Sequence, residues 1–394
     1  MNHVLFDDVT RDRLLPFTHT RPVADIRCGI LTMRERWELC LHTTTSSLTE
    51  TYLQGVFPTL AAEDNVYING GLFGNALIAD AISRLQPGQA LVKGALFIAA
   101  RLTEKMSTPK ELHTRLLAMP AQHFEGEVAA LKNIWDIFIL NDNAIREDFA
   151  LVTKGRKSAP VPQDITVTGS DHLFIEEGAN IYAGCIINAS AGPVYIGKSA
   201  EILEGTMIRG PLAVCGHSVV KMGAKIYGAT TIGPGCKVGG EINNAVFFAN
   251  SNKAHDGYLG NAVIGEWCNL GADTNCSNLK NNYDSIKIWD EAANTSVHTG
   301  LTFCGLLMGD HSKCSINTMF NTGTVVGVSC NIFGGGFPEK FVRSFSWGGS
   351  EGVVSYNFSR AMETANRMMN RRGRQLNEAE LEMLKHVFEY SNNR

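Results

Sequence analysis

The residues best suited to chemistry lie in the segment 240–279, around one histidine. His255 opens the stretch His-Asp-Gly-Tyr-Leu-Gly, and residues 269–278 read Asn-Leu-Gly-Ala-Asp-Thr-Asn-Cys-Ser-Asn. An imidazole has an unperturbed pKa near neutral pH, so it can remove the proton from an amine that attacks an acyl carbon. Backbone N–H groups can stabilise the oxyanion that this attack forms. His255 is therefore a candidate general base.

The elements that would position this segment follow from an internal repeat of six residues. The frame covers 175–187, is displaced by a short insertion at 191–193, and returns at 264–270 and 308–332. A period of six fits neither an α-helix nor a free hairpin, but it fits a solenoid in which each hexad is one short strand and a turn. Three hexads close a triangular coil, and stacked coils bury aliphatic columns. The longest unbroken run of aliphatic positions is Ile196, Ile202, Ile208, Val214, Val220, Ile226, Ile232 and Val238.

Glycine often follows the aliphatic position, as in Ile196-Gly197 and Ile232-Gly233, where it permits the turn. The chain has 39 Gly but only 12 Pro in 394 residues. Proline would be awkward in stacked coils, which need backbone N–H donors. The repeats over about 165–335 resemble the hexapeptide-repeat family. That resemblance implies an all-β domain folded as a left-handed parallel β-helix.

Segment 240–279 also resembles the acetyltransferase domain of the bifunctional sugar-phosphate enzymes that make UDP-N-acetylglucosamine, especially the archaeal type. The similarity lies in the two stretches quoted above, which begin at His255 and Asn269. It implies that His255 is the general base and that Tyr258 and Asn278 hold the sugar phosphate. It gives no comparable role to three other histidines, His217, His298 and His311.

The same resemblance implies acetyl-coenzyme A as co-substrate and a homotrimer with active sites between subunits. The phosphates of the coenzyme need cations. Lys313, Lys340 and Arg343 lie in the late repeats, where the family's coenzyme contacts fall. We expect these three residues to bind the cofactor, while a solvated surface charge is the alternative for each. Residues 299–304 depart from the archaeal pattern, in which basic residues are common there.

A second resemblance lies near the N-terminus. The stretch Arg13-Leu-Leu-Pro-Phe-Thr18-x-x-Arg21-Pro is similar to a segment of sugar-1-phosphate nucleotidyltransferases. Those enzymes have a Rossmann-like α/β fold and join a nucleoside triphosphate to a sugar phosphate. The resemblance implies a shortened domain of this type, with nucleotide contacts from Arg13, Thr18 and Arg21.

The nucleotide site departs from the family pattern at several positions. Residues 7–12 contain three acids and no glycine, although a phosphate-binding loop needs glycine for close backbone approach. Val23 stands where the family has a lysine. Gly70 and Gly71 could compensate, or they could form a simple turn. Mg²⁺ is expected only if nucleotidyl transfer is retained, with Asp142 as the residue that could help hold it.

Three segments are expected along the chain. Residues 1–160 form the shortened nucleotidyltransferase-like domain, 165–338 the β-helix domain and 339–394 a C-terminal helical cap, with a linker near 154–164. Asn377 and Glu380 have the spacing of a helix capping box. Apolar periodicity predicts helices at 33–41, 74–85, 110–117, 356–372 and 377–390, and strands at 65–69 and 90–92.

Composition excludes several classes of protein. A hydrophobic content of 44% with 19% charged residues supports a folded core and excludes a disordered chain. A net charge of −4 gives no field for binding nucleic acid. The 10 cysteines contain no Cys-x-x-Cys pair, so we expect reduced thiols and no zinc site. Without an apolar run of membrane-spanning length or a secretory leader, we expect a soluble, cytoplasmic protein with no membrane partner.

The sequence favours an acetyl-coenzyme A-dependent N-acetyltransferase that acts on a hexosamine 1-phosphate of the glucosamine 1-phosphate type. Two alternatives stay open. One is a sugar-1-phosphate nucleotidyltransferase that makes UDP- or dTDP-sugars, and the other is a non-catalytic scaffold that binds sugar phosphates. The β-helix fold does not decide between them, because one fold supports many functions. The identities of the sugar and the acyl group are also left open.

Overall fold

The computed structural model describes residues 2–393, which group into two compact units. The first unit holds the residues up to Ile26, together with Leu31–Ile134 and Asn377–His386. The second unit holds Arg27–Ile30, Trp135–Leu376 and the residues from Val387 onward.

The first unit is built on a six-stranded mixed sheet in the order β2-β1-β3-β5-β4-β6. β1 lies between β2 and β3 and runs parallel to both. β5 is antiparallel to β3 and β4, and β6 is parallel to β4. Together with its helices, this sheet confirms the α/β class expected for the N-terminal segment. The strands span Asn2–Phe6 (β1), Ser46–Leu48 (β2), Asn65–Asn69 (β3), Gln89–Lys93 (β4), Leu96–Leu102 (β5) and Ala121–His123 (β6).

The first three α-helices of the chain each begin at a polar residue that caps the helix. Thr32 Oγ1 accepts from the Glu35 N–H at 3.1 Å, and the Glu35 carboxylate accepts from the Thr32 N–H at 2.6 Å. Asn75 and Thr108 cap the next two helices in the same way. The three helices expected here are confirmed, with bounds Met33–Leu41 (α1), Ala76–Ser83 (α2) and Pro109–Leu117 (α3). Short 3-10 turns cover Arg11–Leu14, Phe17–His19, Val23–Asp25 and Thr51–Leu53.

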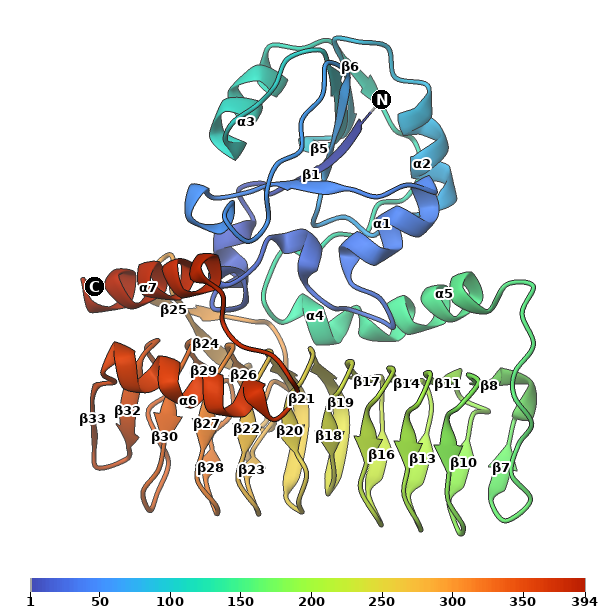
Figure 1. Ribbon diagram of the computed structural model, residues 1–394, viewed down its shortest axis with the longest axis vertical. Helices are drawn as coiled ribbons and strands as arrows, with labels where there is room; N and C mark the ends of the chain where they lie inside the picture. Colours follow the sequence, from blue (N-terminus) through green and yellow to red (C-terminus); the bar gives the residue numbers. More distant parts are fainter. Residues whose placement is uncertain (1, 394) are drawn as a thin grey trace. The chain divides into compact units, whose positions relative to one another are not determined.

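The second unit is a parallel β-helix whose coils stack one on the next (Figure 1). Strands of successive coils pair in parallel and in register, which places equivalent residues of each coil above one another. The side chains of such a column are at most 3% exposed, as the six-residue period requires. The hexapeptide β-helix expected from the sequence is thus confirmed. One column runs through Ile187, Ile208, Ile226, Ile242 and Leu259.

The coils present three faces. Strands β19 (Glu241–Phe247) and β21 (Tyr258–Ile264) are long and turn from the first face to the second. The first face also holds β7 (Thr166–Thr168), β10 (Ile186–Asn188), β13 (Met207–Arg209) and β16 (Lys225–Tyr227). The second holds β8 (Leu173–Ile175), β11 (Val194–Ile196), β14 (Leu212–Val214), β17 (Thr230–Ile232), β26 (Leu307–Met308), β29 (Val325–Val326) and β31 (Phe341–Val342).

The third face carries the strands that matter most for the candidate site. It ends in an antiparallel pair, β32 with β33. Two further short strands, β23 (Asn275–Cys276) and β28 (Met319–Phe320), pair with each other. The third-face strands are β9 (Asn180–Ile181), β12 (Glu201–Ile202), β15 (Val219–Val220), β18 (Lys237–Val238), β20 (Asn252–Lys253), β22 (Asn269–Leu270), β27 (Lys313–Cys314), β30 (Asn331–Ile332), β32 (Ser346–Gly349) and β33 (Gly352–Ser355).

Several elements of the second unit lie outside the coils. Helices α4 (Asp136–Ile139) and α5 (Asn141–Thr153) pack on the second face, against β17, β19 and β21. A hairpin of β24 (Lys287–Asp290) and β25 (Thr295–His298) fills the gap in the repeat between 270 and 308. The periodicity did not predict this hairpin.

The two C-terminal helices expected from the sequence are present, as α6 (Phe358–Asn370) and α7 (Glu378–Asn392). α6 runs along the coils (Figure 1). The expected capping box at the start of α7 is confirmed, because Asn377 Oδ1 accepts from the Glu380 N–H and the Glu380 carboxylate accepts from the Asn377 N–H, each at 2.9 Å.

All 10 cysteines are free thiols, and only Cys40 is not buried. Burial raises the pKa of Cys236 to about 12, as expected for a structural thiol. Within residues 2–393 no helix combines the length and the apolar character that crossing a membrane requires.

Candidate active site

The loop that carries His255 joins β20 on the third face to β21. The His255 side chain is exposed. The loop backbone is held from inside the coil by Lys253, whose side chain is fully buried. Lys253 Nζ donates to the carbonyl oxygens of His255 at 2.7 Å, Asp256 at 3.2 Å and Gly239 at 3.3 Å. One buried amine therefore fixes the backbone on which the candidate general base sits.

Lys253 occupies a position that the repeat gives to an aliphatic residue. Its register partner on the preceding coil is Val238, which is also fully buried. Burial lowers the pKa of Lys253 to about 8, while the charge of Asp256 acts in the opposite direction. A buried ammonium is costly unless its protons are bonded, and the three carbonyls meet this need. A lysine at an aliphatic position departs from the repeat pattern, and such departures are expected at functional loops.

A cavity of about 740 Å³ lies between the third face and α6. His255 lines it, and so does Lys313 of β27, one of the three residues expected to bind the cofactor. The structure thus brings the candidate general base and one candidate cofactor contact into the same cavity. The other side chains that line it from the strands are those of Lys237, Asn252, Asn269 and Leu270, and those from α6 and the following turn are Thr364, Arg367, Met368, Arg371 and Arg372.

The lining of this cavity is strongly basic. Five of the described lining residues are Lys or Arg, and none is Asp or Glu. Lys313 Nζ donates to the His311 carbonyl at 2.7 Å, and burial lowers the pKa of Lys313 to about 8. Arg367 forms an exposed ion pair with Glu363, one turn earlier on α6, at 2.5 Å. A cavity lined in this way fits an anion, and a phosphate group can accept several of these donors at once.

Arg372 has a structural task that sets it apart from the other arginines. Its guanidinium donates to Asn250 Oδ1 and Asn252 Oδ1, each at 3.1 Å, and also to the Gly235 carbonyl. It lies over the Trp267 ring, 5.8 Å from the centroid. These contacts anchor the end of α6 to the coils. Arg367 and Arg371 are consequently the better candidates for holding an anion.

Tyr258 and Asn278, the expected sugar-phosphate contacts, lie together. Asn278 Nδ2 donates to the Tyr258 hydroxyl at 2.9 Å and to Asn261 Oδ1 at 2.8 Å. Burial raises the pKa of Tyr258, while hydrogen bonds from Asn243 and Asn278 act in the opposite direction. Neither Tyr258 nor Asn278 lines the cavity that contains His255. Their role as substrate contacts stays a prediction.

Lys340 and Arg343, the other two expected cofactor contacts, line a different cavity. Its volume is about 720 Å³, and one wall is the β24–β25 hairpin. The three expected cofactor residues are therefore divided between two cavities, with Lys313 in one and Lys340 and Arg343 in the other.

The expected nucleotide contacts differ in their accessibility. Arg13 is exposed, but Arg21 is only 4% exposed and Thr18 is fully buried. Thr18 Oγ1 donates to the Arg11 carbonyl at 2.9 Å, and the Arg11 guanidinium donates to the Thr18 carbonyl at 2.6 Å. Thr18 thus holds the turns around it together.

The loop after β1 is organised by one of its acids. Asp7 accepts from the Val23 N–H at 2.8 Å and from the Thr49 hydroxyl at 2.6 Å. Burial raises the pKa of Asp7 to about 6, although the Arg11 charge opposes the shift. Val23, at the lysine position of the nucleotidyltransferase pattern, is fully buried.

Two further expectations concern phosphate and metal binding. Gly70 and Gly71 form a turn after β3, in which the Gly71 N–H donates to Asn69 Oδ1 at 3.0 Å. Asp142 lies in the first turn of α5 and pairs with Arg146 at 2.5 Å. Among residues 2–393, no group of three or more His, Cys, Asp or Glu side chains has the arrangement of a metal site.

Sequence reasoning missed two features of the candidate site. The first is the set of arginines at the end of α6 and in the following turn, for which the stretch Arg-Met-Met-Asn-Arg-Arg-Gly-Arg at 367–374 was an available signal. Arg367 and Arg371 are four residues apart, so they share one face of a helix. The second is Lys253, which sits at an inward position of a hexad and could have been noticed as a lysine in an aliphatic frame.

Comparison with known proteins finds one matching family model and several relatives of low sequence identity. The family model described as "Sugar nucleotidyl transferase" matches residues 3–157. The bifunctional protein GlmU of Synechococcus elongatus is 26% identical over 189 residues, which cover 45% of this chain and 37% of that protein. The bifunctional sugar-1-phosphate nucleotidylyltransferase/acetyltransferase of Sulfurisphaera tokodaii is 26% identical over 153 residues, 38% of each chain.

A third relative is the putative uncharacterized acetyltransferase YaiX of Escherichia coli K12, which is 26% identical over 159 residues, covering 40% of this chain and 68% of the relative. The match to the Synechococcus protein spans little more than a third of that protein's length.

Proposed function

We propose that this chain is a transferase that acetylates a sugar phosphate, on the basis of its similarity to bifunctional sugar-1-phosphate nucleotidyltransferases and acetyltransferases. The proposed reaction moves an acetyl group from acetyl-coenzyme A to the amine of a hexosamine 1-phosphate. The amine attacks the thioester carbon, the C–S bond breaks, and the products are the amide and free coenzyme A.

The observation that carries this proposal is the cavity shared by His255 and the basic side chains. An exposed imidazole lies in one cavity with Lys313, Arg367 and Arg371, and no carboxylate lines it among the described residues. His255 would take the proton from the attacking amine. The lysine and the arginines would hold phosphate oxygens of the coenzyme or of the sugar. When bound, the coenzyme supplies the activated acyl group.

A direct test follows the free thiol released from acetyl-coenzyme A in the presence of glucosamine 1-phosphate. We expect thiol release that depends on the sugar phosphate and falls about 100-fold or more in His255→Ala, the range lost with a general base. His172→Ala is the matched control, because His172 is also exposed and lies at the start of the repeats. Absence of thiol release, or equal rates in His255→Ala and the unmodified protein, would overturn the proposal.

The proposal includes a homotrimer, since the resemblance to hexapeptide acyltransferases implies active sites between subunits. Sedimentation equilibrium measures this directly. A chain that stays monomeric while acetylating the sugar phosphate would show that one copy completes the site.

A second candidate function is sugar-1-phosphate nucleotidyl transfer, which is favoured by the match of residues 3–157 to the sugar nucleotidyl transferase family. The burial of Thr18, Arg21 and Val23 counts against it, because these side chains do not offer donors to a triphosphate. Pyrophosphate release from UTP or dTTP with a sugar 1-phosphate and Mg²⁺ tests this activity. The scaffold alternative predicts thermal stabilisation by the sugar phosphate with no turnover.

A further inference from the structure

A second basic cavity lies apart from the one that contains His255, and its lining includes Lys340 and Arg343, which were expected to bind the cofactor. Its volume is about 720 Å³, and it is lined by the β24–β25 hairpin and by the chain from Phe337 to Val353. Four of its described lining residues are basic, and one is acidic, Glu339. No residue is shared between this cavity and the one that contains His255. The basic residues are Lys280, Lys287, Lys340 and Arg343.

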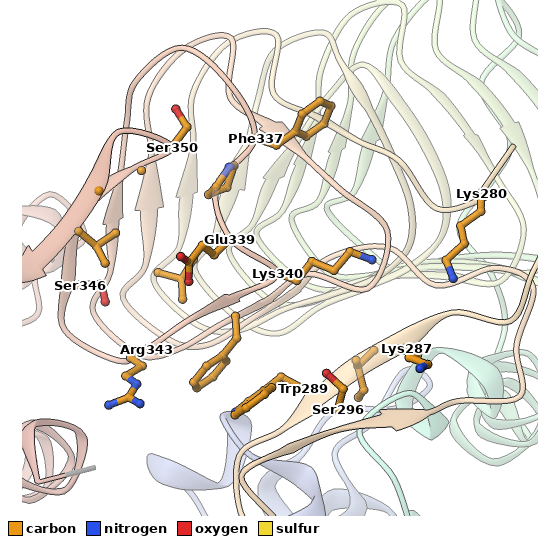
Figure 2. A pocket seen from close by; sticks show the side chains of 17 residues that line it. Lys280, Lys287, Trp289, Ser296, Phe337, Glu339, Lys340, Arg343, Ser346 and Ser350 are labelled. Carbon is orange, nitrogen blue, oxygen red and sulfur yellow. The ribbon is translucent and has the colours of Figure 1, made fainter.

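Two of the lysines lie close to each other. Figure 2 shows the Lys340 side chain extended toward Lys280. The pKa of Lys340 is lowered by burial first and then by the charge of Lys280, so the two amines are close enough to repel. Lys280 Nζ donates to the Ser285 carbonyl at 2.8 Å, and Lys340 Nζ donates to Thr322 Oγ1 at 3.4 Å. Both of these partners are neutral, so neither hydrogen bond compensates the positive charge of the two lysines.

The other part of the cavity wall is aromatic. Trp289 of the hairpin and Phe341 of β31 are stacked, with ring centroids 5.4 Å apart and planes inclined by 20°. Phe337 is 52% exposed and lines the same cavity. A planar base stacks well on such rings, with about 1–3 kcal/mol for each base–aromatic contact. Paired amines suit phosphate oxygens.

From this juxtaposition of paired lysines and aromatic rings that line one cavity, we infer that the cavity binds a nucleoside diphosphate group, as in a free nucleotide or a nucleotide sugar. The phosphates are held between Lys280 and Lys340, and the base lies against the aromatic wall. The site is distinct from the proposed acetyl-transfer site, since Lys313 and His255 do not contribute to it.

Binding of ADP and UDP by isothermal titration calorimetry tests the inference, with inorganic pyrophosphate and coenzyme A as comparison probes. The double variant Lys280→Gln/Lys340→Gln should raise the Kd of both nucleotides at least tenfold. Trp289→Leu should raise it several-fold while leaving the Kd of pyrophosphate unchanged. The double variant Lys154→Gln/Lys157→Gln is the control, since both lysines are exposed and lie outside the cavity.

Three results would overturn the inference. Nucleotide affinity that is unchanged in both cavity variants would place binding elsewhere, for example in residues 3–157. Pyrophosphate that binds as tightly as ADP would show a phosphate site without base recognition. Coenzyme A that binds more tightly than ADP, with the same dependence on Lys280 and Lys340, would make this the coenzyme site. His255→Ala should retain nucleotide binding, which separates this test from that of acetyl transfer.

Discussion

Lys253 Nζ donates to the carbonyl oxygen of His255 at 2.7 Å, so a lysine buried inside the coil is bonded to the backbone of the candidate general base. The two side chains point to opposite sides of the coil wall, one buried and one exposed. This hydrogen bond, donated from inside the β-helix, fixes the backbone from which the His255 imidazole extends.

Replacing this lysine should loosen the loop while leaving the coils assembled. Lys253→Met keeps an unbranched side chain in the column but removes the three hydrogen bonds that Lys253 Nζ donates to the carbonyls of Gly239, His255 and Asp256. We expect kcat for acetyl transfer to fall about tenfold with little change in KM, and amide exchange in residues 254–257 to become faster. Lys225→Met, at an exposed lysine of β16, is the control. Unchanged exchange in the loop would contradict this role.

The same lysine predicts a pH dependence of stability. The pKa of Lys253 is lowered from 10.5 to about 8 in the folded chain. Below pH 8 both states hold the proton, and the folded state carries the cost of a buried charge. Between pH 8 and 10.5 the unfolded chain binds more protons, so this residue's contribution to the free energy of unfolding rises with pH.

Comparison with Lys253→Met isolates this contribution, because the other titrating groups are common to both proteins. Across the window from pH 8 to 10.5, the unmodified protein should gain about 3 kcal/mol relative to the variant, the value of a pKa shift of this size. Denaturant unfolding at several pH values measures the difference. A difference that is flat or falls with pH would show that the buried amine is not neutralised in this range.

Arg367 of α6 and Arg371, which directly follows the helix, should act on substrate binding rather than on the chemical step. Arg367→Gln and Arg371→Gln each remove a cation from the cavity that contains His255. A charge-assisted hydrogen bond contributes about 1.5–3 kcal/mol, so KM for acetyl-coenzyme A should rise at least tenfold while kcat changes little. Arg360→Gln, on the same helix but outside the cavity, should leave both constants unchanged. Steady-state kinetics on the three variants distinguishes these effects.

The capping box of α7 gives a prediction about local stability. Asn377→Ala removes the acceptor of the Glu380 N–H and should cost about 1 kcal/mol at the start of the helix. The Glu380 amide should then exchange about fivefold faster, with no change in the coils. Asn370→Ala serves as the control, since Asn370 ends α6 and its side chain is exposed. Equal protection of the Glu380 amide in both variants would show that the cap does not contribute.

The β-helix could be predicted because its inward positions repeat every six residues, and every coil must bury the same column. The Ile187, Ile208 and Ile226 column shows this directly. The candidate site was harder to predict, because it depends on contacts between distant segments. Arg371 meets Lys313 at one cavity only because α6 returns along the third face, and no local pattern encodes that return.

The nucleotidyltransferase-like segment shows that a sequence motif does not predict which of its side chains are exposed. Arg13, Thr18 and Arg21 share one motif, yet the turns around them bury two of the three side chains. Motif spacing gives the order of residues along the chain, whereas exposure depends on how the chain folds back. Asp7 illustrates this, since an acid at the place of the phosphate-binding loop accepts a hydrogen bond from the Val23 N–H.

The hairpin inserted between β23 and β26 does not disturb the register of the coils around it. Val263 pairs with Leu307 and Ile264 with Met308, as if the residues between were an ordinary coil. Each coil needs only its two neighbours, so a corner can acquire an extension at little cost to the stack. The hairpin that carries Trp289 can therefore change in evolution, and with it the ligand of this cavity, without any change in the coil that carries His255. In this architecture the two basic cavities can be altered separately.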